Sequence, residues 1–361
     1  MILIKKAYFE EFLSVVCFLK KKKKIFLVKI ENKIIRFFYL GEVEVVYKKK
    51  IDFEGKIEIL IEYEHIEKII KNLKNDFYVN INLKDKSVNI RENKFFFSSN
   101  CIINNNYCYI SSIKKKKDLV NKIYIESSIF LECFDYSFFF EKTFLVKKQG
   151  INLFFYKRKF NCFSTDGFRA IFYKNEMEYI NDKSNIFIKK DLVVFINRII
   201  RKRKYSSFFI KEFKKFILIS FRDFKIYSTD TFKKNNDYKS IIKINKDYKK
   251  IKLNNSLFLD SIKKFDFCSL EKNSKLKIVI KKTELIISHN NEKIFLKDKI
   301  PILKFQGYKK DVTLFLNFNY IKDFLNINKS LIFCLSIIDK KSMIYLSSKN
   351  ASLIYCFMPI N

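Results

Sequence analysis

Glycine and proline are scarce in this sequence, which has five glycines and two prolines among 361 residues. A phosphate-cradling Walker loop or a dinucleotide fingerprint needs several closely spaced glycines at the start of a helix. No two glycines here have that spacing, so the sequence argues against an ATPase or an NAD-dependent enzyme. Tryptophan is absent, whereas phenylalanine occurs 42 times.

Histidine and cysteine form no recognisable metal or catalytic motif. The two histidines lie far apart, and the eight cysteines include no CxxC pair. We interpret the cysteines as free thiols of a reducing cytosol, the alternative being a zinc or disulfide role. Asp166 is the strongest candidate for a catalytic carboxylate, but the sequence provides neither a partner histidine nor the spacing of metal ligands around it. We therefore expect no catalytic residues, no metal and no cofactor.

Long apolar runs are also missing. No run approaches the roughly 18 residues that a membrane span requires, and the first six residues lack the charged-then-apolar order of a signal peptide. We expect a cytoplasmic protein with no membrane partner.

Arginine is rare although the chain is strongly basic. Eight arginines among 73 basic residues leave 65 lysines, and the formal net charge is +35. With 48% apolar residues the chain has enough material for sizeable cores, so a folded polyanion binder is the first interpretation. The abundance of Lys, Asn, Ile and Phe is also typical of a reduced, AT-rich bacterial genome. The charge therefore indicates nucleic acid without establishing it.

The strongest positive feature is an internal repeat. Residues 57–70 read as an alternating strand followed by a helix, with Ile66, Ile69 and Ile70 on one face. Residues 185–196 repeat this phrase with Leu192 at a shift of 126 residues from Ile66, and residues 312–325 repeat it with Ile321 at a further shift of 129 residues from Leu192.

Each phrase is preceded by an amphipathic segment near the start of its unit and followed by short β-type runs. A unit of about 120 residues is too long for a solenoid repeat and long enough for a complete small α+β domain. We predict three α+β domains, at residues 1–118, 119–243 and 244–361.

A turn motif lies inside the second unit, where Ser164-Thr-Asp-Gly-Phe-Arg-Ala170 separates two predicted strands. Thr-Asp-Gly alone indicates only a tight turn. Together with the threefold repeat, the phrase Leu316-Asn-Phe-Asn-Tyr320 and the terminal Tyr355-Cys-Phe-Met-Pro-Ile360, it resembles the bacterial sliding clamp family, the β subunit of DNA polymerase III. The resemblance covers the whole chain in order.

The resemblance implies three tandem clamp domains, with two subunits closing a six-domain ring around duplex DNA. It implies a processivity factor without an active site, whose partners are double-stranded DNA, a second copy of the chain, the replicative DNA polymerase α subunit and the clamp loader. The alternative from the residues alone is a nonspecific basic nucleic-acid-binding protein that does not encircle DNA.

The resemblance implies that cations on the helices face the central hole of the ring, the bore, through which the DNA passes. Weak contacts with the DNA phosphates would let the protein slide along the duplex. The candidates are Lys20, Lys21, Lys22, Lys23, Lys24, Lys68, Lys71, Lys142, Lys147, Arg198, Arg201, Lys202, Lys263 and Lys264. The alternative is a solvated basic face.

The resemblance also implies an apolar cleft that accepts short peptides from partners. Its predicted members are Thr165, Gly167, Phe168, Arg169, Ala170, Ile241, Asn317, Tyr320, Met358, Pro359 and Ile360. For the tail residues the alternative is the packing of the last strand.

In this family, subunits join at sheet edges. The resemblance predicts that Phe95 and Phe97 of one subunit face Phe267 and Cys268 of the other. The alternative is that these phenylalanines fill the core of their own domain.

Overall fold

The structure is a computed structural model. The residues that it describes are 2–17, 19, 25–40, 43–82, 87–92, 95–100, 119–137, 150–156, 158–176, 184–229, 248–267, 275–291, 294–307 and 311–360.

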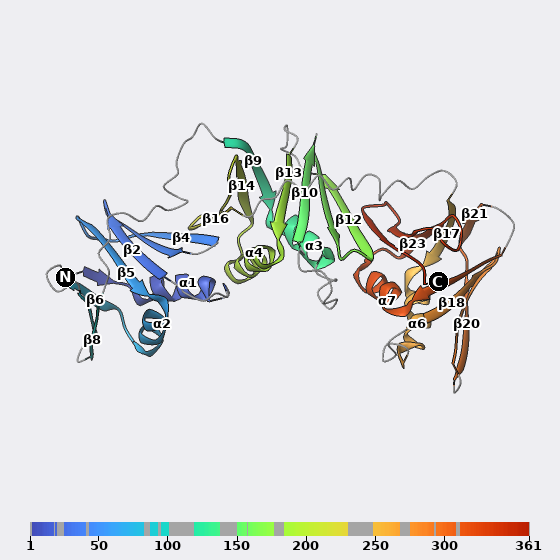
Figure 1. The fold of residues 1–361 in the computed structure, drawn as a ribbon, viewed down its shortest axis with the longest axis horizontal. Helices are drawn as coiled ribbons and strands as arrows, with labels where there is room; N and C mark the ends of the chain where they lie inside the picture. The colour runs from blue at the N-terminus through green and yellow to red at the C-terminus, as the bar shows by residue number, and fades with distance from the viewer. Residues whose placement is uncertain are drawn as a thin grey trace. The chain divides into compact units, whose positions relative to one another are not determined.

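The described helices and strands follow one order three times (Figure 1). Repeat 1 contains β1 (Ile2–Ile4), α1 (Lys6–Val16), β2 (Ile25–Glu31), β3 (Ile34–Leu40), β4 (Val43–Lys50), β5 (Lys56–Glu62), α2 (Tyr63–Asn72), β6 (Phe77–Asn82), β7 (Ser87–Glu92) and β8 (Phe95–Asn100). Repeat 2 contains β9 (Leu119–Glu126), α3 (Ser127–Ser137), β10 (Gly150–Tyr156), β11 (Lys159–Thr165), β12 (Arg169–Glu176), β13 (Ser184–Lys189), α4 (Lys190–Arg203), β14 (Ser207–Phe213), β15 (Ile217–Ser220) and β16 (Phe224–Ser228).

Repeat 3 has the same order with one additional short strand, β21 (Lys304–Gln306). Its other elements are β17 (Lys249–Asn254), α6 (Asn255–Lys263), β18 (Lys275–Ile280), β19 (Glu284–Asn290), β20 (Phe295–Pro301), β22 (Val312–Asn317), α7 (Phe318–Ile327), β23 (Ile332–Ile337), β24 (Ile344–Ser348) and β25 (Leu353–Phe357). The three predicted strand-to-helix phrases are confirmed as β5–α2, β13–α4 and β22–α7.

The helices form where apolar residues recur at helical spacing. In α4 the buried side chains include Leu192, Phe195 and Ile196, with the next turn continuing the same face. The helices of repeat 3 begin at asparagine N-caps, since Asn254 accepts a hydrogen bond from the Leu257 amide and Asn317 accepts one from the Asn319 amide. Each of these helices therefore buries one face and presents the other to solvent.

Sheets continue from one repeat into the next at two places, which we call joint 1 and joint 2. At joint 1, β4 pairs antiparallel with β16 inside a sheet of order β5-β2-β3-β4-β16-β15-β14-β9. At joint 2, β12 pairs antiparallel with β25 inside a sheet of order β13-β10-β11-β12-β25-β24-β23-β17-β21. Two smaller sheets remain, β1-β6-β7-β8 and β20-β19-β18-β22.

By its internal contacts the chain divides into two compact units. One unit comprises Met1–Phe130 and Ile188–Phe232, and the other comprises Leu131–Phe187 and Lys233–Asn361. Each unit contains one joint, because the strands of repeat 2 are shared between the two extended sheets. The boundaries at residues 118/119 and 243/244 remain a prediction.

Joint 1 is built around Glu11 of α1. The phenol of the fully buried Tyr47 donates a hydrogen bond to the Glu11 carboxylate, and Arg203 Nη1 at the end of α4 lies 3.6 Å from Glu11 Oε1. Arg203 Nη2 also donates to the Glu11 carbonyl at 2.9 Å. The Tyr47 ring stacks on Phe224, its partner on β16, with 4.6 Å between ring centroids.

Joint 2 repeats this arrangement with Glu132 of α3. The phenol of Tyr173 on β12 donates a hydrogen bond to the Glu132 carboxylate. Lys329, which follows α7, places its Nζ 3.7 Å from Glu132 Oε1. Both joints therefore combine a strand pair, a tyrosine–carboxylate hydrogen bond and an ion pair.

One interpretation from the sequence is wrong. Cys133 of α3 and Cys162 of β11 form a disulfide, with 6.4 Å between their Cα atoms, whereas we expected free thiols. The fold brings together two buried cysteines that are 29 positions apart. This separation matches no cysteine motif, so the sequence did not indicate the pair. Among the described cysteines, Cys17, Cys334 and Cys356 form no disulfide.

None of the described helices combines the length and the apolar character needed to cross a membrane.

The environment of Glu11 predicts a pH-dependent contribution to stability. Burial alone raises the pKa of Glu11, but the hydrogen bond from Tyr47 and the charges of Arg203 and Lys49 lower it below its ordinary value of 4.5. A carboxylate with a lowered pKa stabilises the fold above its ordinary pKa, and this contribution is lost as the pH falls through the pKa of the folded state. At pH 7 we expect Glu11→Gln to melt roughly 3–10 °C below the unmodified protein.

The difference in melting temperature should shrink as the pH is lowered from 5 to 3, measured by scanning calorimetry. Glu54→Gln is the matched control, because Glu54 is strongly exposed and its ion pair with Lys33 lies at the surface. A pH-independent difference would mean that the Glu11 charge does not stabilise joint 1.

Candidate partner-binding and nucleic-acid sites

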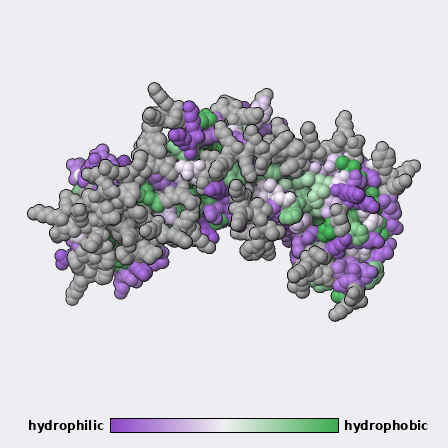
Figure 2. Space-filling view, in the orientation of Figure 1, coloured by the Kyte–Doolittle hydropathy of each residue, from purple (hydrophilic) through white to green (hydrophobic). Residues whose placement is uncertain are grey.

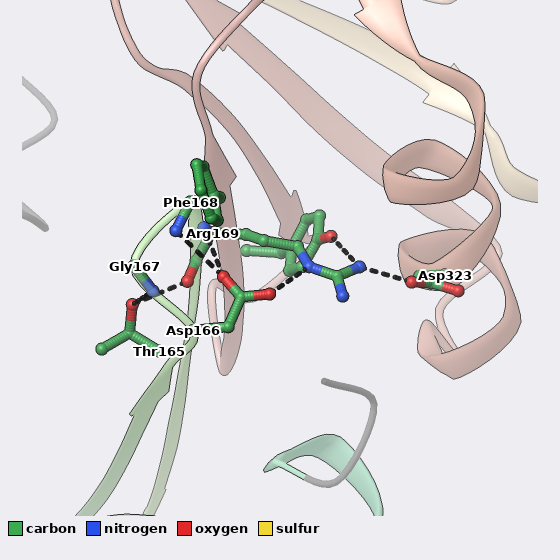
Figure 3. Close-up of polar contacts among 7 residues, drawn as sticks. Thr165, Asp166, Gly167, Phe168, Arg169 and Asp323 are labelled. Carbon is green, nitrogen blue, oxygen red and sulfur yellow. Dashed lines mark hydrogen bonds and ion pairs between the residues drawn. The ribbon is translucent and has the colours of Figure 1, made fainter. Parts of the chain in front are cut away.

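The β11–β12 turn is closed by its own side chains (Figure 3). Thr165 Oγ1 accepts a hydrogen bond from the Gly167 amide at 3.0 Å and donates one to the Arg169 carbonyl at 2.8 Å. Asp166 Oδ1 accepts from the Phe168 and Arg169 amides at 3.0 and 2.9 Å. Gly167 has a φ of 93°, a conformation that favours glycine. The predicted tight turn is confirmed, and Asp166 stabilises it by accepting hydrogen bonds from two of its backbone amides.

Arg169 connects this turn to the helix and the last strand of repeat 3 (Figure 3). Its Nε donates to Asp166 Oδ2 at 2.8 Å, while Nη1 donates to Asp323 Oδ2 of α7 at 2.5 Å and to the Tyr355 hydroxyl at 3.4 Å. The guanidinium also lies over the Tyr320 ring, 4.6 Å from its centroid. Arg169 is therefore a buried, multiply bonded link within joint 2, and burial raises the pKa of the neighbouring Tyr355 phenol.

Two large apolar side chains stand exposed where the joint 2 ladder ends. Arg169 pairs with Phe357 on β25, so Phe168 and Met358 are the next residues beyond the last pair. Their exposed fractions are 56% and 48%. The tail continues to Ile360, whose amide donates to the Phe315 carbonyl of β22 at 2.8 Å. We call Phe168, Met358, Ile360 and Phe315 the tail patch.

The other predicted cleft residues have different positions. Ala170 is buried opposite Cys356, Asn317 caps α7, and Tyr320 is half-buried against Arg169 and Phe357. Pro359 is also half-buried, and Ile241 lies outside the described residues. The structure thus brings the turn, the start of α7 and the tail together, while their role in binding a peptide remains a prediction.

Sequence reasoning missed three members of this cluster. Asp166 was noted only as a candidate acid, and neither Asp323 nor Tyr355 was selected as a site residue. Asp323 follows Tyr320 by three positions on α7, so both side chains are on the same face of that helix. That spacing was the available signal for Asp323.

The predicted DNA-contacting residues that the structure describes are exposed and lie on or beside three helices. They are Lys68 and Lys71 of α2, Arg198, Arg201 and Lys202 of α4, Lys263 of α6 and Lys264, its C-cap. Several have intramolecular partners: Lys71 pairs with Glu67 at 2.9 Å, Lys263 with Asp260 at 3.4 Å and Lys264 with Asp298 at 2.8 Å. The run Lys20, Lys21, Lys22, Lys23 and Lys24, and also Lys142 and Lys147, lie outside the described residues.

Of the predicted subunit-contact residues, Phe95 and Phe97 belong to β8, the edge of the sheet β1-β6-β7-β8. Phe97 lies opposite the buried Ile90 in the β7–β8 register. Phe267 is half-buried and makes an edge-to-face contact with His289 at 5.6 Å, and Cys268 lies outside the described residues.

Within the described part of the chain, no group of three or more His, Cys, Asp or Glu side chains is placed to hold a metal ion.

Several solved structures with the same fold come from bacteria. No protein-family model and no curated protein matches the sequence. The DNA polymerase III β subunit of Pseudomonas aeruginosa superposes with a TM-score of 0.83 at 16% identity, covering 100% of this chain and 99% of that chain. This is the fold of a sliding clamp.

Two further clamp structures agree. The β chain of Streptococcus pneumoniae is 16% identical, with a TM-score of 0.79 and full coverage of both chains. The β subunit of Thermotoga maritima is 13% identical, with a TM-score of 0.78, and covers 100% of this chain and 99% of its own. The predicted α+β clamp fold is therefore confirmed.

The burial of Arg169 predicts unequal effects for its two carboxylate partners. Asp166 is fully buried, so Asp166→Ala should leave the buried Nε of Arg169 and the Phe168 and Arg169 amides without their acceptor and reduce the free energy of unfolding by about 3–5 kcal/mol. Asp323 is partly exposed, so water can replace it, and Asp323→Ala should cost clearly less. Urea unfolding of the two variants measures the difference; equal losses would contradict this account of the site.

Proposed function

We propose that this protein is a DNA sliding clamp: two copies close a ring around duplex DNA and tether the replicative polymerase, with no chemistry of their own. The observation that carries the proposal is the full-length clamp fold, with its threefold repeat of sheets joined edge to edge. Solved structures that share this fold include DNA polymerase III β subunits, and several of them are described as sliding clamps.

The sheet edges support ring closure by a second copy. In each joint the last strand of the first hairpin group, β4 or β12, pairs with the last strand of the following repeat, β16 or β25. The corresponding strands that remain at sheet edges among the described elements are β20 in repeat 3 and β8 in repeat 1. A second copy supplies the missing partner for each edge, which satisfies backbone groups that are otherwise left to solvent.

The helix cations support a DNA contact without sequence preference. The exposed Lys68, Arg198 and Lys202 present positive charge on α2 and α4, and phosphate contacts of this kind carry no sequence information. A factor that moves with a polymerase needs such contacts, because they hold DNA without fixing a position. The proposed bore residues are those predicted from the sequence.

Encirclement can be separated from simple adhesion by cutting the DNA. The protein is loaded on nicked circular DNA by a clamp loader, the salt concentration is raised, and the circle is then cut with a restriction enzyme. We expect retention before the cut and loss after it, because a closed ring leaves only over a DNA end. A protein held by lysine–phosphate contacts alone loses affinity steeply with salt on any DNA. Equal release from circles and linear DNA would favour the nonspecific binder.

The tail patch is proposed to bind the clamp-binding peptide of the polymerase. A few exposed apolar anchors usually supply most of the affinity in such contacts. Fluorescence anisotropy with a peptide from the α subunit should show at least about tenfold weaker binding for Phe168→Ser and for Met358→Ser. Leu331→Ser is the matched control, because Leu331 is an 82% exposed apolar residue away from the patch. Unchanged affinity in both patch variants would exclude this site.

A further inference from the structure

The first helix of each repeat carries a carboxylate at the same position. Glu11 is the sixth residue of α1 and Glu132 is the sixth residue of α3. In its joint, each of these carboxylates accepts a hydrogen bond from a tyrosine and pairs with a cation. The sixth residue of α6 is Asp260, which is exposed and contacts Lys263 on its own helix at 3.4 Å. Repeat 3 therefore has a carboxylate at the helix position that joints 1 and 2 use.

The cation of each joint comes from the end of the second helix in the next repeat. Arg203 is the last residue of α4, and Lys329 lies two positions beyond the last residue of α7. In repeat 1 the helix α2 has the same length as α7, and the residue two positions beyond its end is Lys74. Lys74 is exposed, and its backbone amide is held by Glu92 Oε1 at 2.7 Å. Repeat 1 thus supplies a cation of the kind that joint 2 uses.

The strand registers indicate how the two remaining edges correspond to the joints. Tyr47 pairs with Phe37 on β3, and Tyr173 pairs with Cys162 on β11. The residue in the same hairpin position of repeat 3 is Asp298, which pairs with Ile287 on β19. The aligned two-residue turns before β3, β11 and β19 fix this equivalence.

Across the joints, Tyr47 lies opposite Phe224 and Tyr173 lies opposite Leu353. Phe224 and Leu353 are the first residues of β16 and β25, and the first residue of β8 is Phe95. A third joint in the same register therefore sets Asp298 opposite Phe95, and it brings the end of α2 to the sixth residue of α6.

In the proposed ring, where β20 of one copy pairs with β8 of a second copy, we propose that Asp260 forms an ion pair with Lys74 of the partner subunit. This inference rests on the proposed two-subunit ring and identifies the charge contact that orients its subunits. Over α6, β18 and β20, Figure 2 shows mostly hydrophilic residues with isolated apolar ones among them, which fits a joint oriented by charge. Opposite charges at fixed positions favour the correct register, and like charges there oppose assembly.

The third joint differs from the other two in one respect. The tyrosine that donates to the helix carboxylate in joints 1 and 2 is replaced by Asp298, whose Oδ2 contacts Lys264 at 2.8 Å. Asp260 therefore has no phenol donor at the equivalent position, and Lys74 of the partner subunit adds a second cation to the contact that Asp260 makes with Lys263. For this reason reversal of either charge should weaken the dimer strongly.

A charge-swap series tests the pair. Sedimentation equilibrium over a concentration range gives the dimer dissociation constant for the unmodified protein, Asp260→Lys, Lys74→Glu and the double variant. We expect each single reversal to raise this constant at least about tenfold, and the double variant to return to within about threefold of the unmodified protein. Glu54→Lys is the control for net charge, since Glu54 lies in a surface loop of repeat 1.

The outcomes separate this inference from the proposed function. A monomeric unmodified protein at micromolar concentration would overturn the ring itself. A dimer whose dissociation constant changes no more in the two single variants than in Glu54→Lys would leave the ring intact and overturn the Asp260–Lys74 pair. Melting temperatures measured at concentrations where all variants are monomeric verify that each variant folds.

Discussion

The pairing of sheet edges is the constraint on which this structure depends. A strand at the edge of a sheet leaves a row of backbone N–H and C=O groups without protein partners. The chain satisfies two such edges internally, by joining β4 to β16 and β12 to β25. Those strand pairs bring α1 to the end of α4 and α3 to the segment that follows α7, which creates the Glu11–Arg203 and Glu132–Lys329 contacts. The helix charges are thus secondary to the backbone ladders that position them.

Joint 2 also positions the candidate partner site. The ladder between β12 and β25 ends at Arg169 and Phe357, so the Thr165–Arg169 turn and the tail leave the sheet at the same point. The ion pairs of the buried Arg169 with Asp166 and with the partly exposed Asp323 then fix the turn to α7. Burying a guanidinium is costly unless it is paired, so this network specifies one arrangement of turn, helix and tail. The exposed side chains of Phe168 and Met358 therefore extend from a turn and a tail that this network holds in place.

Much of the fold could be predicted from the sequence because its signals are local. The repeated strand-to-helix phrases depend on apolar periodicity within about 14 residues, and the turn depends on the local preferences of Asp166 and Gly167. The edge strand β20 was not predicted, since its lysines and terminal proline weaken the pattern of alternation.

Interactions between distant residues could not be predicted in the same way. The contact between Arg169 and Asp323 spans 154 positions, and the disulfide between Cys133 and Cys162 has no characteristic spacing. The sequence does contain the residues of these contacts, but only the assembled sheets decide which of them meet. The strongly basic composition likewise conceals which cations already have carboxylate partners, such as Lys71 and Lys264.

The two remaining sheet edges, β8 and β20, differ from each other, and this has a consequence for assembly. A molecule with two unlike, mutually complementary edges associates head to tail, and such association either closes into a ring or continues as an open filament. The angle contributed by each joint decides between these results, because closure requires the rotations to sum to a full turn. In the proposed assembly, the geometry of β4 against β16 and of β12 against β25 therefore determines whether growth terminates. A substitution that alters the twist at either internal joint would then change whether the assembly closes, without touching the edges proposed to associate.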